Sequence, residues 1–136
     1  MSEREFRFII ITEKYEETVA FYRDGLGLTV KETWEKGASN RATLFEASSG
    51  IIEVVATPLF SDPAGELLTA GLPRGTTIGI EVGDVDVWYE KIRAKHLHLR
   101  KGLSDLPWGH RGFSISDPNE MAVYIFSKSQ KESLSP

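Results

Sequence analysis

The chain of 136 residues contains no cysteine and only three histidines. Without cysteine it can form no disulfide framework, no thiolate nucleophile and no zinc site built from thiolates. Its 16 basic and 20 acidic residues give a net charge of −4, which argues against nucleic acid, because phosphate binders usually present a basic face. No apolar run is long enough to span a membrane, and the charged start MSEREFRF does not resemble a signal peptide. We therefore expect a cytoplasmic protein with neither membrane nor nucleic acid as a partner.

The sequence does contain one pattern of elements that occurs twice. A short, apolar, β-branched run is followed by apolar residues at helical spacing, which end at the glycines of RDGLGLTV. Three strand-like runs come next. The first unit, residues 5–57, is thus predicted as a strand at 6–11, a helix that Thr12 would cap, and strands near 28–34, 41–47 and 51–57.

After a break in this pattern the same order begins again. Residues 58–75 hold three prolines and three glycines and are typical of a linker. Asp84 can cap a helix whose apolar stripe includes Trp88 and Tyr89. The second unit, residues 76–127, is predicted as a strand at 76–82, this helix, and strands near 97–101, 111–116 and 121–127, before a polar tail at 128–136. The order predicts one α+β domain over residues 1–136, built from tandem βαβββ units.

Two stretches at opposite ends of this duplicated chain, TVAFYRDGLGLTV and WGHRGFSISDPNEMAVYIF, make it resemble the vicinal-oxygen-chelate superfamily. Glyoxalase I, extradiol dioxygenases and bleomycin-resistance proteins are members. The resemblance implies two curled mixed sheets around a concave cavity. The family usually has glycine after the Asp-Pro-x turn, where this chain has Glu120. A type I turn accepts most residues, so we expect this departure to have little effect.

Metal-using members of the family carry one ligand on the first and last strand of each unit. The resemblance places these positions at Arg7, Glu53, Thr77 and Tyr124. Only Glu53 is an ordinary ligand, because arginine has no free lone pair, threonine is a weak ligand and tyrosine is mostly protonated. A register slip would put Phe6 or Phe8 at the first position, which is no better. We therefore predict no metal site and no cofactor.

In the resembled fold Arg7 and Glu53 lie on neighbouring strands and would form an ion pair. Such a pair could fill a vacated metal site, or Arg7 could bind an anionic or carbonyl group of a ligand. The sequence leaves both readings open. Gly79 could similarly allow close approach of a ligand or simply relieve crowding.

The remaining candidate site residues are aromatic or titratable. Alternation on the 76–82 strand puts Thr77, Gly79 and Glu81 on one face. Trp108 stands in a loop and could gate a pocket, and the histidine that follows it could serve as an acid–base group. His96 and His98 share a strand face, but no third metal ligand is evident. The predicted ligand-binding set is Arg7, Phe45, Glu53, Thr77, Gly79, Glu81, Trp108, His110, Tyr124 and Phe126.

The resemblance implies a metal-independent small-molecule-binding protein of the bleomycin-resistance type, with an antibiotic as one candidate ligand. The alternative is a lyase, isomerase or dioxygenase with an unusual site, in which Glu53, Glu81 or His110 would transfer protons. Catalytic residues are not assigned at this point. Relatives of this length commonly form homodimers with shared pockets, and we expect the same here.

Overall fold

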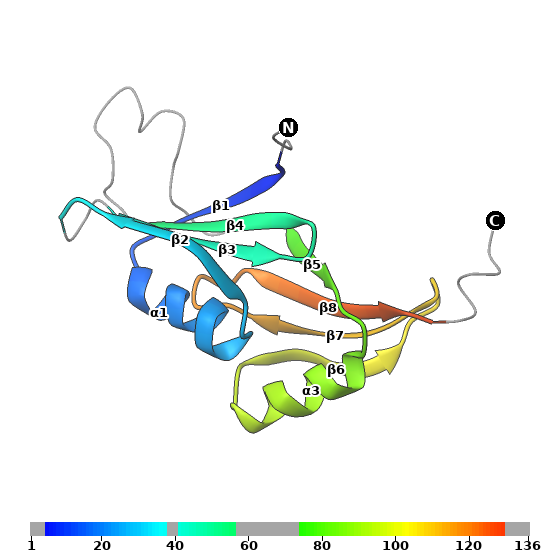
Figure 1. Cartoon of the computed structure of the whole chain (residues 1–136). Coiled ribbons are helices and arrows are strands. Elements are labelled where there is room, and N and C mark those ends of the chain that lie inside the picture. The colour runs from blue at the N-terminus through cyan, green and yellow to red at the C-terminus, as the bar shows by residue number, and fades with distance from the viewer. Residues whose placement is uncertain (1–4, 38–40, 57–73, 130–136) are drawn as a thin grey trace. The chain divides into compact units, whose positions relative to one another are not determined.

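The structure, a computed structural model, describes residues 5–37, 41–56 and 74–129. The chain divides into two compact units, Met1–Leu72 and Pro73–Pro136. Among the described residues, each unit has one helical segment and one curled, four-stranded mixed sheet, so the predicted α+β class is confirmed (Figure 1). The predicted linker at 58–75 and the tail at 128–136 lie largely outside the described residues.

The sheet of unit one has a parallel strand pair at one edge and antiparallel pairing across the rest. The sheet order is β1-β4-β3-β2, and only β1 and β4 are parallel. Its elements are β1 (Arg7–Thr12), helix α1 (Tyr15–Ala20), the π-helical turn η1 (Phe21–Gly25), β2 (Thr29–Glu35), β3 (Arg41–Ala47) and β4 (Gly50–Ala56).

The ends of the helical segment follow from local hydrogen bonding. Thr12 does not occupy the N-cap as predicted: its Oγ1 accepts from the backbone N–H of Lys14 at 2.8 Å, and Lys14 is the N-cap residue. At the other end the N–H of Leu26 donates to the carbonyl of Phe21, five residues back, at 2.8 Å. Gly27 then adopts a φ of +74°, a conformation that favours glycine and ends the helix.

The helical segment covers one face of the unit-one sheet and builds a core there. Tyr22 is fully buried, and its ring lies 6.1 Å from that of Phe45 and 4.8 Å from that of Phe21. The hydroxyl of Tyr15 lies 2.6 Å from Thr43 Oγ1. Residues of β3 with odd numbers therefore point at the helix, and those with even numbers point away from it.

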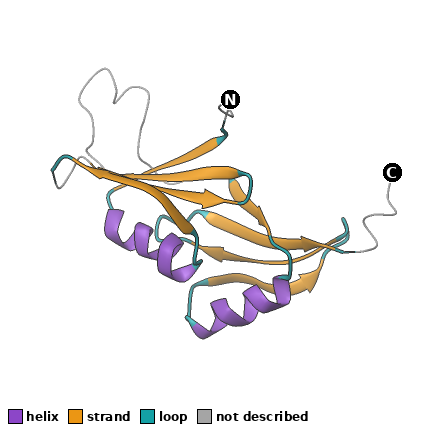
Figure 2. Cartoon of the chain, viewed as in Figure 1, coloured by secondary structure: helices purple, strands orange, loops and turns teal. Residues whose placement is uncertain are grey.

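Unit two repeats this topology with order β5-β8-β7-β6 and a parallel β5–β8 pair. Figure 2 shows one helix on one side of the strands in each unit. The elements of unit two are β5 (Thr77–Glu81), α3 (Val85–Ala94), β6 (Leu99–Asp105), β7 (His110–Ser116) and β8 (Ala122–Lys128).

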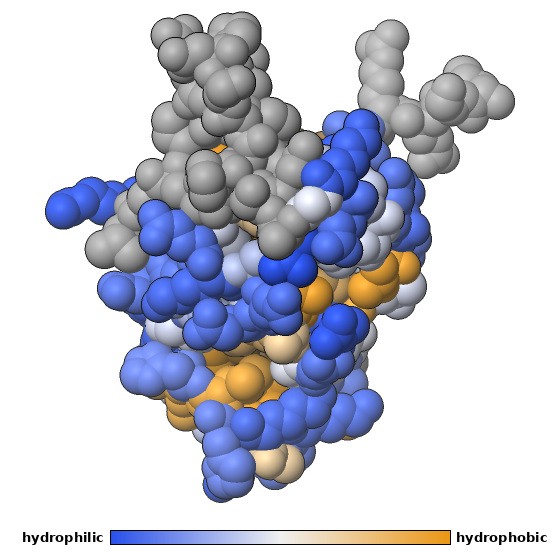
Figure 3. Space-filling view, turned by 90° about the vertical axis from the view of Figure 1, so that its left-hand side faces the viewer, coloured by the Kyte–Doolittle hydropathy of each residue, from blue (hydrophilic) through white to orange (hydrophobic). Residues whose placement is uncertain are grey.

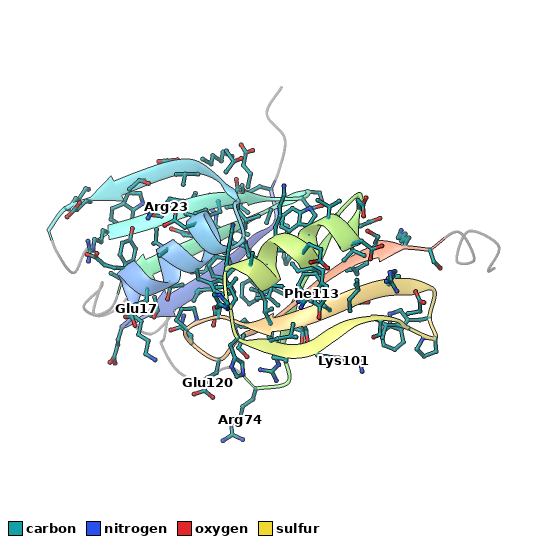
Figure 4. All side chains as sticks on the ribbon, turned by 90° about the horizontal axis from the view of Figure 1, so that it is seen from below. Glu17, Arg23, Arg74, Lys101, Phe113 and Glu120 are labelled. Carbon is teal, nitrogen blue, oxygen red and sulfur yellow. The ribbon has the colours of Figure 1, made fainter. Side chains whose placement is uncertain are left out.

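Helix α3 starts where the sequence predicts. The Asp84 side chain accepts hydrogen bonds from the backbone N–H groups of Asp86 and Val87, which confirms the predicted cap. The helix buries its apolar stripe on the sheet, and the ring of Tyr89 lies 5.0 Å from that of Phe113, which Figure 4 labels.

The turn between β7 and β8 corrects one expectation. The N–H of Glu120 donates to the carbonyl of Asp117 at 3.0 Å, and Asp117 Oδ1 accepts from Asn119 and Met121 at 2.7 and 2.9 Å. Glu120 itself has a φ of +66°, in the left-handed region that favours glycine. Glutamate at this position is therefore strained, and the expectation of little effect was wrong.

Figure 3 shows one side of the molecule as mainly hydrophilic, with hydrophobic patches in orange. Within the described residues, no helix has the length and apolar character required to cross a bilayer.

Candidate functional site

The face of the unit-one sheet that points away from α1 carries Arg7 and Glu53. Register places Ile9 beside Glu53 on the parallel pair and Leu44 beside Glu53 on the antiparallel pair. Because side chains alternate along a strand, Arg7 shares this face and Phe8 does not. The alternative register with Phe8 at the first position is therefore excluded.

Arg7 and Glu53 contact each other, as predicted. Arg7 Nη1 donates to Glu53 Oε1 at 3.0 Å, and the side chains are 35% and 12% exposed. Nε and Nη2 of Arg7 both contact Glu5. Burial would lower the pKa of Arg7, but hydrogen bonds to Glu5 and Glu53 and their charges outweigh it, so the pKa is raised. All three guanidinium nitrogens thus have a carboxylate partner.

An apolar cluster continues this face toward β2 and includes a tryptophan whose orientation the sequence did not reveal. Trp34 and Ile11 are partly buried against the cluster. A hollow of about 390 Å³ lies at the other end of the face, and its lining includes Glu5, Lys31 and Ile51. The cluster itself consists of Ala42, Leu44, Ile51 and Val55.

Phe45 does not belong to this face, although it was predicted to line the cavity. It pairs in register with Ile52, is fully buried, and contacts Tyr22 beneath the helical segment. The physical reason is strand alternation, which puts Leu44 and Phe45 on opposite faces. Phe45 is a core residue of unit one.

The corresponding face of unit two carries most of the other predicted residues. Thr77, Gly79 and Glu81 are exposed, whereas the intervening isoleucines are buried against the helix side. Gly79 pairs with Tyr124, and Glu81 with Phe126. Sequence alternation therefore located this face correctly, and the register adds Tyr124 and Phe126 to it.

Three rings stack on this face. His110 and Phe126 lie 4.2 Å apart with an interplanar angle of 13°, and Tyr124 and Phe126 lie 4.9 Å apart at 13°. Trp108, 58% exposed, lies edge-on to His110 at 6.5 Å. We call these four residues, Trp108, His110, Tyr124 and Phe126, the aromatic stack.

Hydrogen bonds fix the polar edges of the stack. Trp108 Nε1 donates to His110 Nδ1 at 3.2 Å, and the Tyr124 hydroxyl lies 2.9 Å from the same Nδ1. The same indole N–H also donates to the Tyr124 hydroxyl at 3.3 Å, so it has two acceptors within the stack. The stack therefore presents an imidazole beside a phenol hydroxyl, an arrangement that can exchange a proton.

A glycine that the sequence analysis did not single out makes room for the stack. A Cβ on Gly112 would lie 2.7 Å from the Ile125 carbonyl oxygen and 2.9 Å from Tyr124 Cε1. A Cβ on Gly79 would meet Tyr124 and Phe126 at an ordinary 3.8 Å. Gly112, rather than Gly79, is thus the glycine that the packing requires. Only the strand register, which sets Gly112 beside Phe126, identifies it.

The four positions that the resemblance assigns to metal ligands do not fit a metal ion. Arg7 is cationic and occupied by carboxylates, and Tyr124 is hydrogen-bonded to His110. Thr77 is a weak neutral ligand, which leaves Glu53 as the one ordinary ligand of the four. In the described part of the chain, no three His, Cys, Asp or Glu side chains cluster as a metal site would require.

His96 and His98 do not form a second site of this kind. His96 lies in a turn with a φ of +58°, and His98 precedes β6, so the two do not share a strand face. The prediction of strand alternation fails here because the strand starts only at Leu99.

A protein-family model described as the Glyoxalase/Bleomycin resistance protein/Dioxygenase superfamily matches residues 6–125. A search of curated proteins gives no match.

Several solved structures share the fold. A glyoxalase/bleomycin resistance protein/dioxygenase from Nocardioides is 21% identical, with a TM-score of 0.71 over 96% of this chain and 86% of its own. TioX from Micromonospora sp. ML1 is 16% identical, with a TM-score of 0.71 over 93% and 99%. A lactoylglutathione lyase from Agrobacterium tumefaciens is 17% identical, with a TM-score of 0.68 over 93% and 94%. At these identities the likeness concerns the fold alone.

Proposed function

Because the chain belongs to the Glyoxalase/Bleomycin resistance protein/Dioxygenase superfamily, we propose that it binds a small organic ligand without the help of a metal ion. A fold of this kind supports many chemistries, so the proposal depends on the site residues and not on the family. The aromatic stack is the observation that carries it.

The stack has the properties of a surface for a flat, unsaturated ligand. Trp108 is more than half exposed, and His110, Tyr124 and Phe126 are partly so. Aromatic faces offer a large apolar area at low conformational cost and favour offset stacking of another ring. The exposed carboxylate of Glu81 stands beside Phe126 in register, so a cationic substituent on the ligand would be favoured. An aromatic antibiotic is one candidate of this chemistry.

In unit one we assign a supporting role to the Arg7–Glu53 pair. An arginine that grips a ligand's anionic group needs an open pair of parallel donors, whereas the Nε–Nη2 edge of Arg7 already contacts Glu5 and its Nη1 contacts Glu53. The pair therefore fills the position that a metal occupies in metal-using relatives. This favours the reading of a filled site over that of a ligand clamp.

A second candidate is a metal-free lyase or isomerase. The observation that favours it is the 2.9 Å contact between His110 Nδ1 and the Tyr124 hydroxyl, since such a pair can transfer a proton to or from a bound substrate. A dioxygenase is less well supported, because activation of oxygen by a bound metal would need more donors than Glu53.

The two candidates are separated by one set of measurements. A thermal-shift screen with planar aromatic cations, thiol adducts and aromatic diols detects binding through a raised Tm. We expect Tyr124→Leu and Trp108→Ala to abolish a positive response, and Phe6→Ala to preserve it as the control, because Phe6 is an aromatic residue 75% exposed outside the stack. Turnover of a hit, lost in both His110→Gln and Tyr124→Phe, would favour the enzyme.

Elemental analysis of the untagged protein tests the metal-free part of the proposal. We expect nickel, zinc, iron and manganese far below one equivalent per chain. A stoichiometric metal that disappears in Glu53→Ala would contradict this.

We further propose that the protein is a homodimer with pockets shared between chains. The support is indirect: apolar side chains such as Ile9 of unit one and Leu99 of unit two are exposed. Light scattering at micromolar concentration should give twice the 15.2 kDa chain mass. A monomer would contradict the shared pocket and leave the aromatic stack as a site within one chain.

A further inference from the structure

Unit one contains a second hollow, on a different side from the Arg7–Glu53 face. It has a volume of about 260 Å³ and lies where α1 and η1 meet β2 and β3. Arg7 and Glu53 do not line it, and neither does any member of the aromatic stack. Its volume is slightly below the range of about 300–1,000 Å³ typical of ligand pockets, so only a small molecule fits.

The cation that dominates this hollow is Arg41. Its guanidinium carbon lies 4.4 Å from the centre of the Tyr15 ring, which holds the side chain by a cation–π contact. Nη2 contacts Glu16 Oε2 at 3.1 Å, while the buried Nε has no hydrogen-bond partner among the described residues. A buried donor without a partner is unfavourable, and a guanidinium stays charged. Arg41 therefore has unused capacity for an anion.

The carboxylate that Arg41 now holds is weakly fixed. The side chain of Glu16 is 78% exposed, so most of the free energy of this ion pair is lost to water. A ligand carboxylate that also buries an apolar body can compete with Glu16 for the same guanidinium, and it can bind through two parallel N–H donors.

The rest of the lining provides the apolar body with a surface. Val19 of α1, Val30 of β2 and Trp34 of β2 all line the hollow, and Val30 is 38% exposed. Arg23 adds a second cation from η1, although Asp24 contacts its guanidinium at 2.9 Å (Figure 4). Cation and apolar wall together match a small organic anion.

We propose that this hollow binds a small aryl or short aliphatic carboxylate. The ligand's carboxylate takes the place of Glu16 on Arg41, and its body packs against Val19 and Val30. Arg41 stays over Tyr15 when the ligand is bound, because a cation–π contact uses the face of the guanidinium and leaves the N–H groups in its plane available to the ligand. The site is independent of the aromatic stack and of the function proposed for it.

Titration of the ¹⁵N-labelled protein with sodium phenylacetate, to about 10 mM, tests the site by NMR. We expect saturable shifts at the Thr43 and Val30 amides, with a Kd of about 1 mM, since a ligand of this size has little binding energy. Benzylamine, its cationic counterpart, should cause none of these shifts.

Charge variants on α1 make the test specific. Glu16→Gln removes the competing carboxylate and should tighten phenylacetate binding about 3- to 10-fold. Glu17→Gln changes the net charge equally on the same helix, does not line the hollow, and should change affinity less than 2-fold (Figure 4). Arg41→Gln should weaken phenylacetate binding at least 10-fold. Arg41→Lys keeps the positive charge but lacks the paired N–H donors of a guanidinium, and it replaces Arg41→Gln in the test if that variant does not fold.

Three outcomes would overturn the proposal. The first is no saturation by about 10 mM, where a millimolar Kd requires it. The second is an equal effect of Glu16→Gln and Glu17→Gln. The third is a set of shifts at Trp108 and Tyr124 instead, which would assign phenylacetate to the aromatic stack and leave the proposed function of that stack intact.

Discussion

Trp108 donates its indole N–H to Nδ1 of His110 over 3.2 Å, and the Tyr124 hydroxyl accepts from the same indole N–H at 3.3 Å. Replacing the imidazole by an apolar ring removes one of these two acceptors. We therefore predict that the indole Nε1–H resonance of Trp108 moves upfield in His110→Phe. A ¹H–¹⁵N NMR spectrum, with Trp34 and Trp88 as internal references, measures this.

His110→Gln is the control for that comparison. A glutamine carbonyl can still accept from the indole, so the Trp108 resonance should move less in this variant than in His110→Phe. An indole resonance that does not move in His110→Phe would contradict the assigned hydrogen bond.

The Arg7–Glu53 pair should stabilise the protein modestly. The loss of about 3–5 kcal/mol that is typical of breaking a buried ion pair does not apply, because the Arg7 side chain is 35% exposed. We predict that Arg7→Met or Glu53→Gln lowers the free energy of unfolding by about 1–2 kcal/mol, with a coupling of about 0.5–1 kcal/mol in a double-mutant cycle. Urea denaturation measures both. Glu5→Gln, at a partner 36% exposed, should cost less.

Gly112 and Gly79 form a matched pair on adjacent parts of one sheet face. Gly112→Ala forces a methyl group against the Ile125 carbonyl and the Tyr124 ring, and should lower stability by about 1–3 kcal/mol. Gly79→Ala has room, and should leave stability unchanged or raise it by about 0.5 kcal/mol through the unfolded state. Thermal unfolding of both variants compares them, and equal Tm values would refute the packing argument.

Glu120 offers a stabilising substitution. Its φ of +66° is unfavourable for a residue with a Cβ, so Glu120→Gly should raise the free energy of unfolding by up to about 1 kcal/mol. Asn119→Gly, in the same turn but without a positive φ, should give no such gain. A loss of stability in Glu120→Gly would mean that the glutamate side chain contributes more than its backbone strain costs.

Much of the fold followed from local patterns in the sequence. Most strands in the described residues lie close to their predicted positions, although β6 runs on to Asp105 where the sequence predicted an end near residue 101, and Asp84 caps α3 as its place before an apolar stripe indicates. The contact between Arg7 and Glu53 was also predicted, because the resemblance supplied the strand order and strand alternation supplied the shared face.

The parts that failed depend on facts that a local pattern does not contain. Phe45 was assigned to the ligand face because it is aromatic. It lies two residues after Thr43 on β3, however, so both side chains point toward α1. The strain at Glu120 depends on the turn's full hydrogen-bond pattern, which sets the residue after the type I turn at positive φ. The contact between Arg7 and Glu5 could not be predicted from strand alternation, because Glu5 precedes the first residue of β1.

The sequence by itself determined the element order, the duplication and the chemistry of the metal positions, because periodicity, capping and donor type are properties of neighbouring residues. Only the tertiary structure decided which rings meet. His110 and Phe126 stack at 4.2 Å because antiparallel pairing of β7 with β8 brings together residues 16 positions apart, and Gly112 leaves space for them. Register between strands is set by the sum of many packing contacts across a sheet, and no short stretch of the chain encodes that sum.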